Sequence, residues 1–162
     1  MDLIRELRTT AFASRLKRLG DLLKADATRI YQANGIDFQD SWFLVAVALS
    51  CQDRISVTDM AVTLGISHAA VSQMASAMER KGYIASEPDK KDRRKTLLYL
   101  TNEGRSTIEM IQPFWDAISL CTDELIDFTG KDLIRAITNI EEQLKERSLL
   151  DRVSDKMQYS NR

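Results

Sequence analysis

The stretch GISHAAVSQMASAMERKGYI, residues 65–84, has two sides of very different composition. Apolar residues recur at helical spacing on one side, at Ile66, Val71, Met74, Ala75 and Met78. The other side carries small or polar residues with almost no charge, namely His68, Ala69, Ala70, Ser72, Gln73 and Ser76. A solvated helix normally carries Glu and Lys on its outer side. The shortage of charge therefore predicts a surface that contacts another molecule.

Working outward from this stretch, cap residues and periodicity predict the other elements. Ser67 begins the helix and Gly82 ends it, while Ser56 and Asp59 form an S-x-x-D cap before a short helix that stops at Gly65. Further helices are expected over residues 3–33, 39–51, 101–128 and 131–148, with strands over 83–87 and 96–100. Thr129 is expected to cap the final helix, and Pro113 to kink the one before it. The remaining tail, residues 149–162, is expected to be loosely held.

The charge of the chain is unevenly distributed although its net value is −1. Residues 80–95 carry seven cations and three anions, whereas residues 106–162 carry seven cations and eleven anions. The basic segment includes PDKKDRRK, residues 88–95, which is predicted to be an exposed hairpin tip. A basic patch on an otherwise acidic body is the distribution expected of a protein that presents one face to phosphate.

A short helix, a turn, a second helix and a charged hairpin, in that order, predict a winged helix-turn-helix. Ala69 and Ala70 are small enough to lie against thymine methyl groups, and Gln73 can pair with adenine through two hydrogen bonds. Ser67, Ser72 and His68 can reach a phosphate or a base edge. Free N–H groups at the starts of the two helices add phosphate sites. Each feature alone has a plainer explanation, a solvated face or a solvated turn, but their joint order favours DNA binding.

Other classes of protein find less support. The 162 residues suit one compact domain, or a small domain with helical extensions. The longest apolar run, residues 42–49, is too short to span a bilayer, and the charged start is not a signal peptide, so we expect a cytoplasmic protein. Cys51 and Cys121 are expected to be buried thiols, with no zinc site or disulfide. No cofactor is expected. One histidine and no nucleophile motif argue against an enzyme.

Residues 56–105 resemble the winged-helix core of the MarR (multiple antibiotic resistance regulator) family. The resemblance rests on the D-x-R pattern at Asp92 to Arg94 and the L-T-x-x-G pattern at Leu100 to Gly104. The helices before and after this core also fit that architecture. Residues 15–49, together with HAAVSQ, are also similar to MarR-like domains fused ahead of GNAT-type acetyltransferases, and we expect a free-standing relative of these.

The resemblance implies a mainly α, α+β winged-helix fold and a homodimer that binds double-stranded DNA. Residues 1–35 and 101–148 would form the dimerisation region, and residues 36–100 the DNA-binding domain. In the recognition helix Ala69, Ala70 and Gln73 would face bases, with Ser67, His68 and Ser72 nearby. In the wing Arg93 would enter the minor groove, Asp92 with Arg94 would brace the hairpin, and Lys90 and Lys91 would add charge. Family members often have a basic residue where this chain has Gln73, so operator preference is not carried over. A reactive N-terminal cysteine is absent, which argues against oxidation sensing.

The resulting hypothesis is a ligand-responsive repressor that binds a pseudo-palindromic operator. The alternative is a winged-helix protein–protein interaction module without DNA binding, although a protein partner gives no reason to concentrate cations at the wing tip. Resemblance places small-molecule effectors between the DNA-binding lobe and the dimer helices. The aromatic residues that could line such a pocket, or simply form core, are Tyr31, Phe38, Trp42, Phe43 and Trp115.

Overall fold

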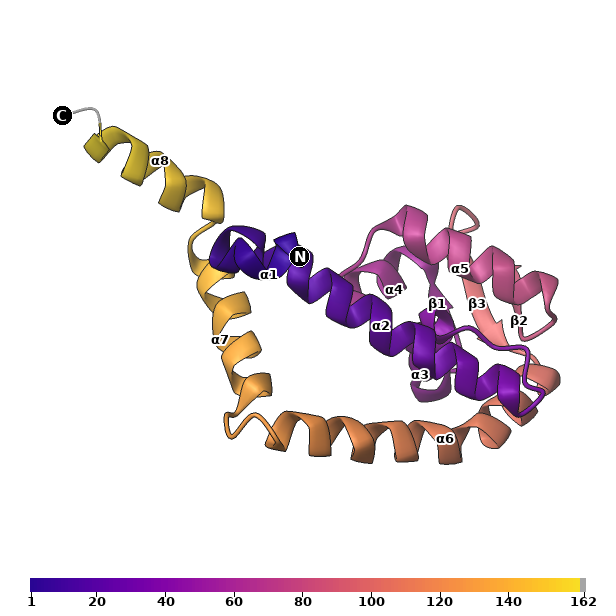
Figure 1. The fold of residues 1–162 in the computed structure, drawn as a ribbon. Helices are drawn as coiled ribbons and strands as arrows, with labels where there is room; N and C mark the ends of the chain where they lie inside the picture. Colours follow the sequence, from indigo (N-terminus) through magenta and orange to yellow (C-terminus); the bar gives the residue numbers. More distant parts are fainter. Residues whose placement is uncertain (161–162) are drawn as a thin grey trace. The chain divides into compact units, whose positions relative to one another are not determined.

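The computed structural model describes the backbone of residues 1–160, which is mainly helical and contains one small sheet (Figure 1). The chain divides into two compact units, Met1–Asp116 and Ala117–Arg162. The first unit contains α1 (Leu3–Glu6), η1 (Arg8–Ala11), α2 (Phe12–Ala33), η2 (Asp40–Trp42), α3 (Phe43–Cys51), β1 (Ile55–Ser56), α4 (Val57–Leu64), α5 (His68–Arg80), β2 (Ile84–Pro88), β3 (Thr96–Leu100) and the first part of α6 (Asn102–Asp127). The mainly α, winged-helix fold predicted from the sequence is confirmed.

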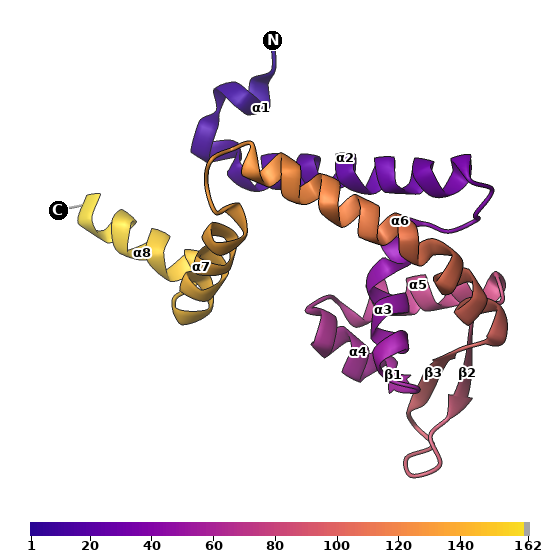
Figure 2. The same ribbon diagram turned by 90° about the horizontal axis from the view of Figure 1, so that it is seen from below.

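The sheet has the order β1-β3-β2 and is antiparallel throughout. Leu98 of β3 pairs with Ile55 of β1, and Leu100 pairs with Ile84 of β2. The two long strands agree with prediction to within one residue, whereas the two-residue strand β1 was not predicted. Helices α3, α4 and α5 gather beside this sheet (Figure 2). Their fully buried side chains form the core together with those of α2 and α6, namely Tyr31, Val45, Leu49, Met60, Val71, Met78 and Ile111.

The junction between the wing and α6 explains the L-T-x-x-G pattern. The Thr101 hydroxyl donates to the Gly82 carbonyl at 2.5 Å and accepts from the Gly104 amide at 3.0 Å, so it caps α6 while tying it to the end of α5. Gly104 lies directly against the backbone of Tyr83. A Cβ atom at residue 104 would stand 2.8 Å from the Tyr83 carbonyl carbon. Only glycine therefore fits here.

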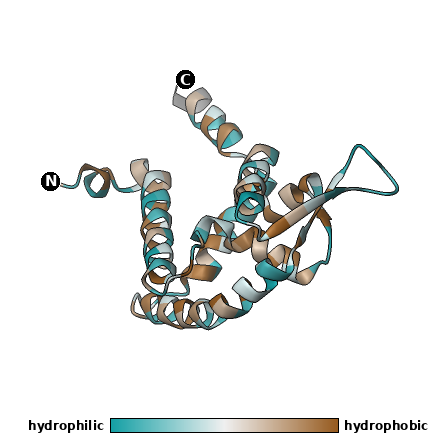
Figure 3. Cartoon of the chain, turned by 90° about the vertical axis from the view of Figure 1, so that its right-hand side faces the viewer, coloured by the Kyte–Doolittle hydropathy of each residue, from teal (hydrophilic) through white to brown (hydrophobic). Residues whose placement is uncertain are grey.

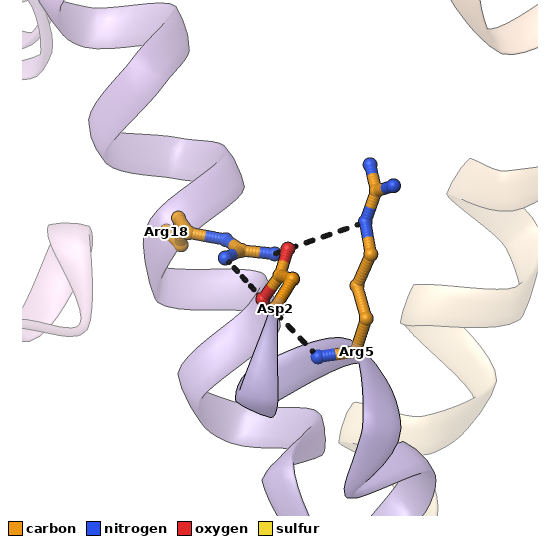
Figure 4. Close-up of polar contacts among 3 residues, drawn as sticks. All are labelled: Asp2, Arg5 and Arg18. Atoms are coloured by element: carbon orange, nitrogen blue, oxygen red, sulfur yellow. Dashed lines mark hydrogen bonds and ion pairs between the residues drawn. The ribbon is translucent and has the colours of Figure 1, made fainter.

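The N-terminal helix differs from the prediction of one helix over residues 3–33. The chain breaks into α1, η1 and α2, and Arg8 has a φ of 49°, which no continuous helix allows. The break coincides with Thr9 and Thr10, whose branched side chains disfavour helix. Arg18 of α2 also donates to the Asp2 carboxylate at 3.0 and 3.1 Å (Figure 4), which holds α1 against α2.

The second unit contains the rest of α6, α7 (Leu133–Glu146) and α8 (Leu149–Ser160). The cap of α7 is Asp132, which accepts from the Arg135 amide at 2.9 Å, so the predicted Thr129 cap is wrong. Thr129 instead donates to the Ile126 carbonyl at 2.7 Å. The tail predicted to be loosely held is helical over Leu149–Ser160, and residues 161–162 lie outside the described part. Pro113 lies within α6.

The two cysteines are free and exposed, so the prediction of buried thiols is wrong. Cys51 ends α3, and Cys121 lies on α6 in a stretch where most side chains are exposed. Within the described residues, no group of His, Cys, Asp and Glu side chains is arranged to hold a metal ion. No helix in this part of the chain is long and apolar enough to cross a membrane.

Candidate nucleic-acid interface

Gly65 and Ser67 fix the turn between α4 and α5, and with it the orientation of α5. Gly65 ends α4 with a φ of 64°, and the next amide, of Ile66, donates back to the Ala61 carbonyl at 3.1 Å. Ser67 then caps α5 by accepting from the Ala70 amide at 3.1 Å. Both caps agree with the sequence prediction. The three-residue turn is therefore fixed by side chains and backbone within the motif itself.

The side of α5 that faces away from the core is accessible. Val71, Ala75 and Met78 are buried, as expected from the apolar periodicity. Six residues of this side were predicted to contact DNA. Four of them are exposed, namely Ser67, His68, Ala69 and Gln73, and two are half-buried, namely Ala70 and Ser72. The Ser72 hydroxyl lies 3.4 Å from His68 Nδ1. Gln73 makes no side-chain hydrogen bond within the described residues, so both its amide donor and its acceptor are available to a ligand.

The loop between β2 and β3 projects from the sheet (Figure 2) and is hydrophilic along its length (Figure 3). Two of its acidic side chains accept hydrogen bonds from backbone amides of the loop itself. Asp89 accepts from the Lys91 amide at 2.7 Å, and Asp92 accepts from the Arg94 amide at 3.1 Å. Asp92 also pairs with Arg94 Nε at 3.4 Å, and the bracing role of these two residues stays a prediction. No carboxylate of the described chain pairs with the exposed side chains of Lys90, Lys91 and Arg93.

A polar groove of about 390 Å³ runs between α5 and the wing. It is lined by Ser56, Val57, Thr58, His68, Ser72, Ala75, Ser76, Glu79, Ser86, Arg94, Lys95, Thr96 and Leu98. Hydroxyl groups dominate this lining, and Glu79 is the acidic residue in it. Lys95 Nζ stands 3.8 Å from Asp59 Oδ2 at one side, which links the wing to the start of α4. Hydroxyls and lysines are typical donors to phosphate oxygens.

The start of α4 borders the same groove. Ser56 accepts from the Asp59 amide at 3.0 Å and donates to the Asp59 carboxylate at 2.6 Å, as the S-x-x-D pattern predicts. The partial positive charge of the helix N-terminus is therefore presented beside Thr58, whose side chain is exposed. The starts of α4 and α5 border one groove, which concentrates donors for an anion there.

Arg54 supports the wing from the loop before β1. Its Nε atom donates to Glu87 of β2 at 2.7 Å, and its guanidinium lies 5.3 Å from the centre of the Tyr99 ring on β3. The hydrogen bond to Glu87 raises the pKa of Arg54 above its ordinary value. One side chain therefore bridges both strands of the hairpin, a role that no local sequence pattern indicated.

The five aromatic residues proposed as a ligand pocket pack against one another. Phe43 and Trp115 meet edge to face with 4.8 Å between ring centres, and Phe38 lies 5.6 Å from Tyr31 and 5.5 Å from Trp42. Trp115 Nε1 donates to the Tyr31 hydroxyl at 3.0 Å. Burial raises the pKa of Tyr31 to about 12. The cluster has the edge-to-face packing of a core, and its use as a ligand pocket stays a prediction.

The segment that builds this candidate interface is similar to segments of known proteins. Residues 35–95, which hold the helix-turn-helix and most of the wing, match the model of the MarR family. This segment is a MarR-type winged helix. The transcriptional activatory protein BadR of Rhodopseudomonas palustris is 32% identical over 98 residues. That alignment covers 60% of this chain and 56% of BadR, so the chain spans about half the length of this relative.

Two solved structures share the fold of this chain. The transcriptional repressor CouR, bound to a 23-mer DNA duplex, is 22% identical with a TM-score of 0.65, and the match covers 86% of this chain and 95% of CouR. BpsR of Bordetella bronchiseptica, whose DNA binding is regulated by 6-hydroxynicotinic acid, is 24% identical with a TM-score of 0.62. That match covers 83% of this chain and 91% of BpsR. At these identities the likeness shows the fold alone. The similarity to acetyltransferase-fused domains stays a prediction.

Within the MarR-type segment, sequence reasoning found the outer side of α5 and the wing tip but missed the groove between them. Thr58, Ser76 and Lys95 come from three different elements, and their proximity depends on the tertiary fold. Ser72 and Ser76 are four residues apart and therefore lie on the same side of the helix. This spacing is a signal in the sequence that indicates a polar groove along α5.

Proposed function

We propose that this chain is a transcriptional regulator of the MarR family that binds double-stranded DNA through α5 and the wing. The observation that carries the proposal is the pairing of an accessible, almost uncharged helix side with a wing tip whose Lys90, Lys91 and Arg93 side chains lack carboxylate partners in the described chain. A helix that reads bases needs close approach, whereas a loop that meets phosphate needs charge. The match of residues 35–95 to the MarR family supports the same conclusion.

In this proposal each residue has a distinct task. Gln73 reads a base edge in the major groove, with Ala69 and Ala70 against thymine methyl groups. Arg93 enters the narrow minor groove, where the potential is most negative. The sugar-phosphate strand between these two grooves of DNA passes along the polar groove of the protein, where Ser72 and Lys95 donate to phosphate oxygens. Ser67 and His68 contact the strand where α5 begins.

We further propose that the chain acts as a homodimer on a pseudo-palindromic operator. Residues 36–100 would bind DNA, and residues 1–35 with 101–148 would join the two copies. Large apolar side chains of these helices are exposed, including Leu23 at 42%, Leu120 at 66%, Leu125 at 61%, Ile134 at 58% and Leu144 at 44%. Exposed apolar surface on this scale is typical of an interface. Two α5 helices related by a two-fold axis would read two half-sites one helical turn apart.

The mode of regulation is proposed to be ligand-responsive repression. CouR is a transcriptional repressor and the DNA binding of BpsR is regulated by 6-hydroxynicotinic acid, which supports this mode, whereas BadR is a transcriptional activatory protein. The competing function is a protein-interaction module without DNA binding. It has no use for three unpaired cations at the tip of one loop. The single histidine, His68, is assigned to DNA contact in this proposal.

The test is binding of the purified chain to labelled duplex DNA, measured by fluorescence anisotropy at several salt concentrations. We expect the logarithm of affinity to fall linearly with the logarithm of salt as counterions are released. The double variant Lys90→Gln/Arg93→Gln should bind more weakly and show a shallower salt slope. Arg29→Gln, which removes an exposed cation on α2, is the matched control and should leave both unchanged. Absence of binding at low salt would support the interaction module instead.

A further inference from the structure

The outer part of the wing extends beyond the third strand of the sheet. The pairing of β1 with β3 ends at Leu97. Strands β2 and β3 remain paired further out, as far as Pro88 and Thr96. A hairpin of two strands is marginally stable in water when no third strand or helix supports it. The direction of the wing tip therefore depends on side-chain contacts near the point where β1 ends.

Arg54 contacts the hairpin at this point. Glu87 of β2 lies opposite Leu97, and its carboxylate accepts a hydrogen bond from Arg54 Nε at 2.7 Å. The Arg54 guanidinium also lies 5.3 Å from the centre of the Tyr99 ring on β3. Glu87 and Tyr99 are diagonal neighbours on one face of the sheet, because Tyr99 pairs with Ala85. One guanidinium therefore spans both strands at the last residue pair that β1 supports.

A second ion pair joins the hairpin to the rest of the chain on its groove side. Lys95 Nζ stands 3.8 Å from Asp59 Oδ2. Among the described residues, this pair and the pair of Arg54 with Glu87 are the ion pairs that connect the hairpin to other elements. In the proposed function Lys95 donates to a phosphate oxygen of DNA, which weakens its pairing with Asp59. The contact of Arg54 with Glu87 then remains to hold the hairpin.

We propose that Arg54 is a positioning residue that aims the wing tip, and with it Arg93, into the minor groove. It acts through its contacts with Glu87 and Tyr99. The inference rests on the proposed function, since it requires that Arg93 contacts DNA. Arg93 lies four residues beyond Leu97, a reach of at most about 13 Å along a strand. A rotation of about 10° at Leu97 would move such a tip by about 2 Å, a third of the roughly 6 Å width of the minor groove.

This role differs from a contribution to stability and from a direct contact with DNA. The side chains of Arg54 and Glu87 are 52% and 38% exposed, and exposed ion pairs contribute little to the free energy of unfolding. Electrostatics and positioning also make opposite predictions for Glu87. Removal of an anion from a DNA-binding wing should tighten binding to every sequence. Loss of the contact with Arg54 should instead remove the base preference that Arg93 imposes.

The test is selection of bound fragments from a pool of random duplexes, carried out with the parent chain and with Glu87→Gln. The parent should enrich a core sequence under α5 and A·T pairs at the flanks. Glu87→Gln should keep the core, because α5 is unchanged, and lose the enrichment at the flanks. In anisotropy titrations, the affinity of this variant for a duplex selected by the parent should fall by about threefold to tenfold. Arg54→Gln should give the same result.

Two further variants serve as controls. Asp53→Asn removes an anion next to Arg54, and among the described residues Asp53 pairs with Arg105 of α6 and not with the hairpin. This variant should keep the A·T enrichment. The charge-swapped chain, Arg54→Glu/Glu87→Arg, should recover part of the enrichment that each single change removes, because it restores an ion pair. Thermal unfolding of every variant should match that of the parent.

The outcomes separate this inference from the proposed function. A Glu87→Gln chain that binds more tightly and keeps A·T-rich flanks, as electrostatics alone predicts, would overturn the role of Arg54. So would a charge-swapped chain that recovers no flank enrichment, or variants that lose core and flank preference together with thermal stability. A parent chain that enriches no sequence at all would refute the proposed function itself.

Discussion

Replacing Gly104 with alanine tests how the wing is joined to α6. A Cβ at this position would lie 2.8 Å from the Tyr83 carbonyl carbon, where ordinary contact begins at about 3.4 Å. The Tyr83 carbonyl oxygen lies closer still to this Cβ, so the peptide of Tyr83 must move by more than about an ångström. It cannot do so freely, because its oxygen accepts from the Thr101 amide at 3.1 Å and from the Thr101 hydroxyl at 3.2 Å.

The magnitude follows from these contacts. Overpacking a close contact costs about 1–3 kcal/mol, and each hydrogen bond that is lost costs about 1 kcal/mol more. The better helix propensity of alanine offsets about 1 kcal/mol. The sum is a loss of roughly 2–4 kcal/mol of unfolding free energy. For a chain of this length that lowers Tm by about 5–15 °C.

The assay is thermal unfolding followed by far-UV circular dichroism. Gly20→Ala is the matched control, because a Cβ there meets no atom within 4 Å and the residue lies inside α2. That change should leave Tm equal or slightly raised, since alanine is favoured over glycine in a helix. If Gly104→Ala melted at or above the temperature of the parent chain, the close approach of α6 to Tyr83 would be refuted.

Four further predictions concern separate parts of the molecule. Gln73→Ala should relax base preference at one symmetric pair of operator positions, at a cost of about 1–3 kcal/mol per lost contact, with an unchanged salt slope in anisotropy titrations. Arg93→Ala should instead weaken binding to many sequences and lower the salt slope by about 1 per subunit. Gly82→Val should lower the unfolding free energy by about 1 kcal/mol or more in denaturant titration, because φ is 77° at this position. Burial raises the pKa of Tyr31 to about 12. Absorbance titration should therefore show one tyrosine that ionises near pH 12, and Tyr31→Phe should remove this ionisation. The folded pKa lies above the unfolded value near 10, so this contribution to stability is complete below about pH 10 and is lost as pH rises towards 12.

The sequence predicted the winged helix well because its boundaries depend on local chemistry. Ser56 and Ser67 each cap a helix through the amide three residues on, and Gly65 and Gly82 take the left-handed conformation that ends a helix. Each of these signals involves residues within four positions of one another, so it can be recognised in the sequence alone. Strand β1 was missed because its two residues become a strand only by pairing with β3, more than forty residues later.

The start of the C-terminal helix α8 carries a sequence pattern that indicates a helix cap. Ser148 accepts from the Asp151 amide at 3.2 Å and donates to the Asp151 carboxylate at 2.6 Å, the same cap that Ser56 forms with Asp59. The pattern indicates a helix start at residue 149, whereas the polar composition of this segment alone predicts a loosely held tail.

The sequence predicted the outer side of α5 and the wing tip, but it did not predict the polar groove between them. The outer side of α5 and the charged wing tip are each one continuous stretch of sequence. Contacts between Lys95 and Asp59, and between Arg54 and Glu87, join residues that are 36 and 33 positions apart. Their distances arise from the packing of α4 and the sheet. Pattern reasoning from one sequence gives no access to such pairs.

The central claim is that two copies of α5 and its wing read DNA sequence directly. Selection of bound fragments from a pool of random duplexes, followed by sequencing, tests this claim and requires no operator to be chosen in advance. We predict a consensus with two-fold symmetry, half-sites separated by one helical turn and A·T-rich flanks under the wings. The Gln73→Ala chain should lose preference at one symmetric pair of positions. A pool that shows no enrichment, or a consensus that Gln73→Ala leaves unchanged, would contradict the account.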